Sequence, residues 1–204
     1  MEKELPENHQ RYLARKEQYK SFGYDIDRER TFIVKQAQPI RGSILEAGTG
    51  KGHFALVLAK EGYKFTTFDI SQEEQRFAKL NLEYYGLRQN VNFLIEDGEH
   101  TSFKDNSFDV IFSVNTIHHL TRPYLVVDEF TRILADKGKI VLSDFTEEGM
   151  QVMDKMHALE GAKHQASGFS IDDIKKYLIG KDFKTKQART RYQEVLIAEK
   201  GERQ

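Results

Sequence analysis

A short apolar run leads directly into a glycine-rich segment near residue 50, and this junction constrains the fold more than any other feature. Residues 43–47 (Ser-Ile-Leu-Glu-Ala) have the composition of a buried strand, and Gly48, Gly50 and Gly52 follow at alternate positions. A helical apolar pattern comes next. Strand, tight turn and helix in this order are typical of an open α/β sheet, which binds ligands at the carboxyl ends of its strands. Glycine in such a turn lets a ligand approach the backbone closely.

The alternation of strand and helix then continues along the chain. Further strands are predicted at 64–69, 91–96, 108–114 and 139–144. This alternation predicts a parallel sheet with helices on both faces. After residue 144 the rhythm changes, and helices are expected over 147–166 and 171–178. Two β-like runs, 183–188 and 192–199, are close enough in sequence to form an antiparallel hairpin.

Residues 1–40 are polar, and no strand is predicted among them. A helix is expected over about 7–20, and a second helix up to about Gln38, where Pro39 ends it. We therefore divide the chain into an N-terminal helical cover, 1–40, and a ligand-binding domain, 41–204. The aromatic residues expected in this cover are Tyr12, Tyr19, Phe22 and Tyr24, and one of the three tyrosines is expected to touch the site.

Charge and cysteine content exclude several classes of function. Lysine and arginine total 31 and aspartate and glutamate total 32, whereas proteins that bind nucleic-acid phosphates usually carry a basic excess. The chain has no cysteine, which excludes disulfides, thiolate zinc sites and cysteine nucleophiles. There is no apolar run of membrane-spanning length and no pattern of a secretory signal. We therefore expect a cytoplasmic protein with no membrane partner; the sequence does not indicate its oligomeric state.

Two acidic residues near the glycines indicate the kind of ligand. Asp69 ends the next predicted strand, where a carboxylate accepts hydrogen bonds from both hydroxyls of a ribose. Glu46 lies just before Gly48, and a carboxylate there repels a pyrophosphate but suits an ammonium group. The third glycine of the dinucleotide fingerprint G-x-G-x-x-G also comes one place early, at Gly52, and His53 takes its position. The sequence therefore favours a nucleoside with an ammonium group over a nicotinamide dinucleotide.

Several motifs in order resemble class I S-adenosylmethionine-dependent methyltransferases, most closely the type-11, ubiquinone-methylase-like branch. The pattern E-x-G-x-G-x-G at 46–52 resembles motif I of that family, and Asp69 resembles the acidic residue of motif II. Three more segments resemble the adenine-contacting segment, the fourth-strand motif and the lead into the fifth strand, at 96–98, 107–120 and 132–140. Lys137 stands where the last of these usually has a glycine. The resemblance implies an α/β, Rossmann-like sheet of seven mostly parallel strands, with helices on both faces and the last strand antiparallel.

By this resemblance the glycine-rich segment holds the methionine end of S-adenosylmethionine, the expected cofactor, which becomes S-adenosylhomocysteine. Glu46 is expected to hold the ammonium group, and the backbone of Gly48 and Gly50 to lie against the methionine moiety. Gly52 belongs to the same motif and is counted with the cofactor-binding residues. Ser113 is expected to offer its carbonyl near the methionine amine.

The same resemblance assigns the adenosine end to the following loops. Asp69 is expected to bind the ribose, and Ile70 to pack on the adenine. A helix-capping role is the alternative for Asp69, but Ser71 already serves it. Asp97 is expected to accept from the adenine amino group beside the Gly98 amide, although an Asp-Gly pair also suits a simple turn.

His118 and His119 follow the fourth predicted strand and are the candidate catalytic residues. A neutral histidine there can accept a proton from an incoming hydroxyl, amine or thiol. The alternative is a structural histidine that packs or forms hydrogen bonds. No carboxylate pattern accompanies the pair, so no metal site is expected. His157 and His164 are weaker candidates within 145–180, where related enzymes build a substrate lid.

Taken together, these features predict methyl transfer to a small-molecule acceptor by in-line displacement. Because the donor is already activated, the protein mainly has to align the reacting atoms and exclude water. The alternatives are a nucleic-acid or protein methyltransferase, and a non-catalytic cofactor-binding protein on the same fold. A nucleic-acid partner is disfavoured, because residues 113–116 (Ser-Val-Asn-Thr) stand in place of Asn/Asp-Pro-Pro-Tyr. The sequence does not identify the acceptor.

Overall fold

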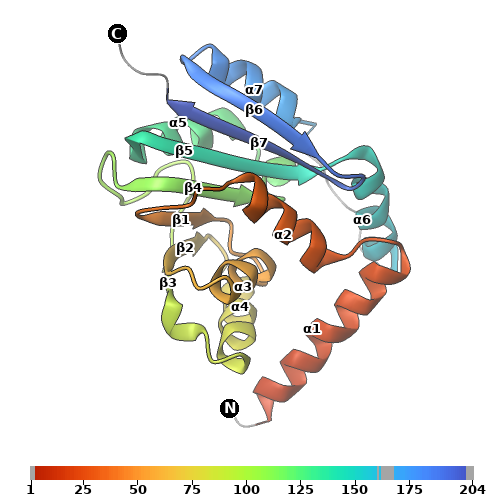
Figure 1. The fold of residues 1–204 in the computed structure, drawn as a ribbon. Helices are drawn as coiled ribbons and strands as arrows, with labels where there is room; N and C mark the ends of the chain where they lie inside the picture. The colour runs from red at the N-terminus through yellow and green to blue at the C-terminus, as the bar shows by residue number, and fades with distance from the viewer. Residues whose placement is uncertain (1–2, 160, 162–167, 201–204) are drawn as a thin grey trace.

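The computed structural model of the chain describes residues 3–159, 161 and 168–200. Its centre is a seven-stranded sheet in the order β3-β2-β1-β4-β5-β7-β6 (Figure 1). The strands are β1 (Ile44–Ala47), β2 (Phe65–Asp69), β3 (Val91–Ile95), β4 (Phe108–Val114), β5 (Leu134–Phe145), β6 (Phe183–Arg189) and β7 (Gln193–Lys200). The α-helices are α1 (Glu4–Ser21), α2 (Ile26–Gln36), α3 (His53–Lys60), α4 (Gln72–Tyr84), α5 (Pro123–Ile133), α6 (Glu147–Leu159) and α7 (Ile171–Ile179). Two short 3-10 helices are η1 (Arg88–Asn90) and η2 (Ile117–His119).

The pairing of the strands confirms the predicted sheet. All neighbours from β3 to β5 are parallel, whereas β7 runs antiparallel to both β5 and β6. The first strand lies between β2 and β4, so the order of the strands reverses there. In open sheets the crevice outside the carboxyl ends of the strands at such a reversal is where ligands bind.

Two apolar layers hold the helices on the two faces of the sheet. On one face, α2, α3 and α4 pack Ile33, Leu58 and Leu82 into a cluster with β1 and β4. On the other face, α5 and α7 pack Phe130 and Ile174 against the opposite sides of the strands. These side chains are fully buried, and burial of one such side chain contributes about 1.5–3 kcal/mol. The layers therefore fix the positions of the strand ends, on which the site is built.

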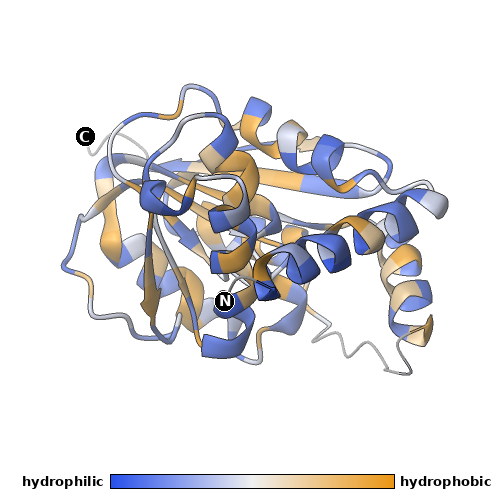
Figure 2. Cartoon of the chain, turned by 90° about the horizontal axis from the view of Figure 1, so that it is seen from below, coloured by the Kyte–Doolittle hydropathy of each residue, from blue (hydrophilic) through white to orange (hydrophobic). Residues whose placement is uncertain are grey.

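The N-terminal helix α1 is mostly polar and lies along one side of the molecule (Figures 1 and 2). Its first turns pack on α4, where Asn8 Nδ2 donates to Asn81 Oδ1 at 2.8 Å. Its last turn joins a third apolar cluster with α6, which includes Tyr19 and Met156. Asp25 caps α2 by accepting from the Arg28 amide at 3.1 Å. The division into a cover and a domain, and the lid at 145–180, remain predictions.

The largest difference from the predicted boundaries is at the start of β5. The strand β5 begins at Leu134 rather than at residue 139, because the chain passes from α5 straight into pairing with Phe108 before a shift of register. The helix α6 is described over Glu147–Leu159, and residues 160 and 162–166 of the predicted helix lie outside the described residues. The helix α7, inside the predicted lid, packs against β6 and β7.

The described part of the chain contains no helix long and apolar enough to cross a membrane.

Candidate functional site

A cavity of about 620 Å³ lies at the point where the strand order reverses. Its walls come from the loops that follow β1, β2, β3 and β4 and from the starts of the next helices. Eight of the nine predicted cofactor-binding residues line it: Glu46, Gly48, Gly50, Asp69, Ile70, Asp97, Gly98 and Ser113. Residues far apart in sequence are thus brought to one crevice, which we call the main cavity.

The glycine-rich loop has the backbone conformation that its sequence predicts. Gly48, Gly50 and Gly52 have φ of 87°, 49° and 80°, a region that side chains with a Cβ rarely adopt. The amides of Gly48 and Thr49 both donate to the carbonyl of Phe68, at 2.9 and 3.0 Å, and this ties the loop to the end of β2. A Cβ on Gly48 would lie 2.6 Å from Thr116 Oγ1. The loop therefore lies tightly against the end of β4.

Gly52 has a different place from the other two glycines. It does not line the main cavity, and a Cβ on it would lie 2.7 Å from the Cβ of Ala78 on α4. Its function in this structure is close packing of the start of α3 against α4. Gly52 is thus the one predicted cofactor-binding residue that does not line the main cavity, although its neighbours Lys51 and His53 do.

Asp69 is held by two backbone amides at the carboxyl end of β2. Its Oδ2 accepts from the Gly50 amide at 2.8 Å, and its Oδ1 accepts from the Ser71 amide at 2.9 Å. Ser71 itself caps α4 by accepting from the Glu74 amide at 3.2 Å, as predicted. Each carboxylate oxygen keeps a second lone pair. The carboxylate is therefore fixed in orientation and still able to accept from a ligand in the main cavity.

Glu46 is an almost fully buried acid, 1% exposed, in the middle of β1. Thr67 Oγ1 donates to its Oε2 at 2.6 Å, and Thr67 in turn lies 2.6 Å from the hydroxyl of Thr49. Burial, with a smaller contribution from the charge of Asp69, raises the pKa of Glu46 to about 8. Among the described residues no basic group forms an ion pair with Glu46. Glu46 is therefore an acid that has no counter-ion among the described residues and can pair with a cation in the main cavity.

The other end of the main cavity is formed by the loops after β2 and β3. Ile70 is 73% exposed and lines the cavity, so its side chain offers apolar surface to a ligand. Asp97 Oδ1 accepts from the amide of Glu99 at 2.9 Å, so the turn suggested by the Asp-Gly pair is present. Gly98 lies near Phe68 and Val126. Asp97 and Gly98 thus combine a local turn with a place in the cavity wall.

Part of this chain is similar in sequence to known methyltransferases. Residues 45–142 match a family described as a methyltransferase domain. The ubiquinone/menaquinone biosynthesis C-methyltransferase UbiE of Rickettsia bellii is 28% identical over 124 residues, 56% of this chain and 49% of that protein. The methyltransferase GfsG of Streptomyces halstedii is 26% identical over 135 residues, 66% of this chain and 49% of that protein. This chain therefore spans about half the length of the curated relatives it matches.

A solved structure has the same fold. The crystal structure of a SAM-dependent methyltransferase from Aquifex aeolicus superposes with a TM-score of 0.66 at 21% identity, over 84% of this chain and 89% of that one. Residues 45–142 form a class I, type-11 methyltransferase domain. S-adenosylmethionine is the cofactor that such a domain implies. The main cavity fits that group, because it pairs a buried acid without a counter-ion with a second carboxylate fixed by two amides.

The two candidate catalytic histidines of the methyltransferase domain have different environments. His118 is 3% exposed, and its Nδ1 lies 2.5 Å from Asp144 Oδ1. The His118 amide also donates to Asp144 Oδ2 at 3.0 Å, so this residue joins η2 to the end of β5. His119 is exposed and lines the main cavity, whereas His118 does not. Of the two, only His119 lies where a ligand in that cavity can reach it.

Sequence reasoning missed two supports of the methyltransferase domain. Arg30 on α2 lines the main cavity although it is only 7% exposed. Asn81 on α4 donates to the carbonyl of Lys51 at 2.9 Å and accepts from Asn8, so it links α1 to the glycine-rich loop. Neither residue belongs to a motif. The signal that could have indicated them is a polar side chain at a helix position where the pattern expects an apolar one.

The remaining predicted residues lie outside the main cavity. The aromatic residues of α1 and the following turn are largely buried in packing, and Tyr12, Tyr19 and Tyr24 line two smaller neighbouring cavities instead. His157 lies on α6, and His164 lies outside the described residues. Within the described residues, no three side chains of histidine, aspartate or glutamate form a group suited to a metal ion.

Proposed function

We propose that this protein transfers a methyl group from S-adenosylmethionine to a small-molecule acceptor in the main cavity. The observation that carries the proposal is that Glu46 and Asp69, from neighbouring strands, line one cavity on either side of the glycine-rich loop. When bound, S-adenosylmethionine supplies a methyl group on a positively charged sulfur, which an acceptor displaces in line. The similarity to a ubiquinone/menaquinone biosynthesis C-methyltransferase supports a small organic acceptor.

In this proposal the two carboxylates hold opposite ends of the cofactor. Glu46 holds the ammonium group with the backbone of Gly48 and Gly50 against the methionine chain, and the Ser113 carbonyl contributes there. Asp69 accepts from the ribose hydroxyls.

The loop after β3 and one apolar side chain complete the adenosine end. Ile70 packs on the adenine, while Asp97 and the Gly98 amide meet its polar edge. The loop after β4 is the place for the acceptor, because it lies at the methionine end of the main cavity. His119 is the residue that takes a proton from an acceptor that arrives protonated. A cytoplasmic location remains part of the proposal.

The matched pair Asp69→Asn and Asp109→Asn tests the proposal. Both aspartates accept from backbone amides, since Asp109 Oδ2 accepts from Ser43 at 2.7 Å, but only Asp69 lines the main cavity. A hydrogen bond to a charged group contributes about 1.5–3 kcal/mol, so Asp69→Asn should weaken S-adenosylhomocysteine binding at least about tenfold. Asp109→Asn should leave the affinity within about threefold of the parent.

Isothermal titration calorimetry with S-adenosylhomocysteine, with thermal unfolding of each variant as a check on folding, makes this measurement. Equal affinity of the parent and Asp69→Asn would contradict the proposal. A parent that binds the cofactor, yet forms no S-adenosylhomocysteine with a broad panel of small acceptors, would favour the non-catalytic alternative.

A further inference from the structure

A second cavity, of about 230 Å³, adjoins the main cavity. Six residues line both of them: Arg30, Lys51, His53, Glu74, Asn115 and His119. None of Asp69, Ile70 and Asp97, at the proposed adenosine end, lines the second cavity. The two spaces therefore meet at the end where the methionine moiety and the reacting sulfur are proposed to lie, and an acceptor occupying the second cavity would face the sulfur.

Arg30 is a buried cation in the wall between these cavities. Its Nη1 donates to Tyr24 Oη at 3.1 Å and to Gln193 Oε1 at 3.2 Å. The amide of Asn115 lies 2.7 Å from Nη2, and its oxygen accepts when turned toward Arg30. Among the described residues, the buried Nε has no hydrogen-bond acceptor and no carboxylate forms an ion pair with the guanidinium. A buried charge with only neutral partners is costly, so this side chain is suited to an anionic ligand.

Glu46 is an acid close enough to Arg30 for the charge of Arg30 to lower its pKa, against the larger effect of burial. In the proposed function, however, Glu46 compensates the ammonium group of the cofactor. One carboxylate compensates one positive charge, so Arg30 still requires an anion when the cofactor is bound.

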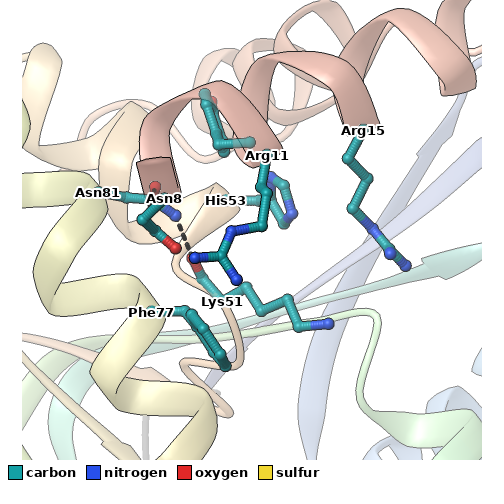
Figure 3. A pocket seen from close by; sticks show the side chains of 8 residues that line it. Asn8, Arg11, Arg15, Lys51, His53, Phe77 and Asn81 are labelled. Carbon is teal, nitrogen blue, oxygen red and sulfur yellow. Dashed lines mark hydrogen bonds between the residues drawn. The ribbon is translucent and has the colours of Figure 1, made fainter. Parts of the chain in front are cut away.

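Further cations line the route toward Arg30. Arg15 and Lys51 line the second cavity, and the acid there is Glu74, whose Oε1 lies 4.0 Å from Lys51 Nζ. A third cavity, of about 220 Å³, shares Arg15 and Lys51 with the second and adds Arg11. Figure 3 shows Arg11 and Arg15 projecting from α1 in the same direction, toward the loop that carries Lys51. This basic lining raises the local concentration of anions.

The walls of the second cavity are otherwise largely apolar, formed by Tyr19, Tyr24, Ile26, Phe145 and Met153. Burial, with the charges of Arg30, Arg15 and Lys51, also lowers the pKa of His53 to about 3, so this shared side chain is neutral. The second cavity thus combines positively charged side chains with space for a small apolar group.

We propose that the methyl acceptor is a small organic anion, a carboxylate or a phosphate ester, whose charged group binds Arg30 in the second cavity. This inference rests on the proposed function and adds the substrate class to it. The carboxylate of the cofactor is a competing occupant of Arg30. The affinity of Arg30→Gln for S-adenosylhomocysteine distinguishes this occupant from an acceptor anion.

Titration of S-adenosylhomocysteine-loaded protein with benzoate, phenyl phosphate and uncharged benzamide tests the inference. At least one of the two anions should bind about tenfold or more tightly than benzamide, and the preferred anion distinguishes carboxylate from phosphate. Arg30→Gln should weaken anion binding about tenfold or more, and Arg30→Lys should weaken it less, because the charge is kept. Both variants should bind S-adenosylhomocysteine within about threefold of the parent.

Lys139→Gln is the matched control, because it removes another buried cation. Lys139 is 8% exposed and donates to the Pro39 carbonyl at 2.6 Å, away from all three cavities. It should leave anion binding unchanged. If Arg30→Gln does not fold, Arg30→Lys and Lys51→Gln carry the test, and both should weaken anion binding measurably.

Anions that bind no better than benzamide, or equally well after these substitutions, would overturn the inference alone. A loss of S-adenosylhomocysteine affinity in Arg30→Gln as large as the loss of anion affinity would also overturn it, since Arg30 would then serve the cofactor. If the parent did not bind S-adenosylhomocysteine at all, the proposed function would fall first.

Discussion

Replacing Glu46 with glutamine should make the ligand-free protein more stable than the parent, by an amount that grows as the pH rises. Burial is the main cause that raises the pKa of Glu46 from 4.5 to about 8, while the hydrogen bond from Thr67 opposes it. The folded chain therefore holds this proton over a pH range in which the unfolded chain has lost it. The stabilisation that Glu46 contributes is fully present below about pH 4.5 and is lost progressively as the pH rises toward 8.

The size of the effect follows from the shift. One pKa unit corresponds to about 1.4 kcal/mol, so a shift from 4.5 to about 8 sets a ceiling of about 5 kcal/mol on the loss. Glutamine cannot lose a proton, and its amide oxygen still accepts from Thr67. The difference in unfolding free energy between Glu46→Gln and the parent should therefore rise by several kcal/mol between pH 5 and pH 8.5.

Urea unfolding of both proteins at pH 5, 7 and 8.5 measures this difference. Glu129→Gln is a control that should change stability in the opposite direction. Burial raises the pKa of Glu129, but hydrogen bonds from Arg132 and Thr101 outweigh it and lower this pKa to about 2. The variant should therefore be less stable than the parent at pH 7. Cofactor binding gives a second readout, because an ammonium group on Glu46 should release close to one proton per site at pH 7. A stability difference that does not change with pH, together with no proton release, would refute the reasoning.

Three further substitutions separate the supports of the site from its binding groups. Gly52→Ala should lower the free energy of unfolding by at least about 1–3 kcal/mol, because φ is 80° and the new Cβ would lie 2.7 Å from the Cβ of Ala78. The melting temperature should fall accordingly, and an unchanged melting temperature would contradict this. Asn81→Ala removes the hydrogen bond to the Lys51 carbonyl, so S-adenosylhomocysteine should dissociate about three- to tenfold faster in stopped-flow experiments, and an unchanged rate would show that the loop is held otherwise. Asp144→Asn should lower the unfolding free energy by about 1–3 kcal/mol, since it disturbs a buried pair with His118, yet calorimetry should find cofactor affinity within about threefold of the parent. A large loss of affinity in Asp144→Asn would instead link His118 to the cofactor.

The parts of the site that the sequence predicts are those encoded locally. Gly48 and Gly50 precede a helix and follow a buried strand, and a turn of that kind needs positive φ at those positions whatever surrounds it. Asp69 ends the next strand, and parallel pairing of β1 with β2 places it beside the loop. These inferences needed only the strand order.

The parts that the sequence does not predict depend on packing between distant segments. Arg30 is a charged residue on the buried face of α2, and the sequence does not show that Gln193 of β7 and Tyr24 are its hydrogen-bond partners there. Gly52 belongs to the motif but serves the contact with α4, which no local pattern reveals. The two histidines are adjacent in sequence, yet only His119 faces the main cavity, because the turn of η2 directs His118 to Asp144. Tertiary contacts decide all three.

The most direct measurement is a crystal structure of the protein with S-adenosylhomocysteine. We expect the ribose hydroxyls about 2.6–3.0 Å from the Asp69 carboxylate, and the amino group within hydrogen-bonding reach of Glu46, directly or through one water. Density for the nucleoside anywhere other than the crevice at the carboxyl ends of β1 and β2, or in that crevice with Asp69 turned away from the sugar, would contradict it.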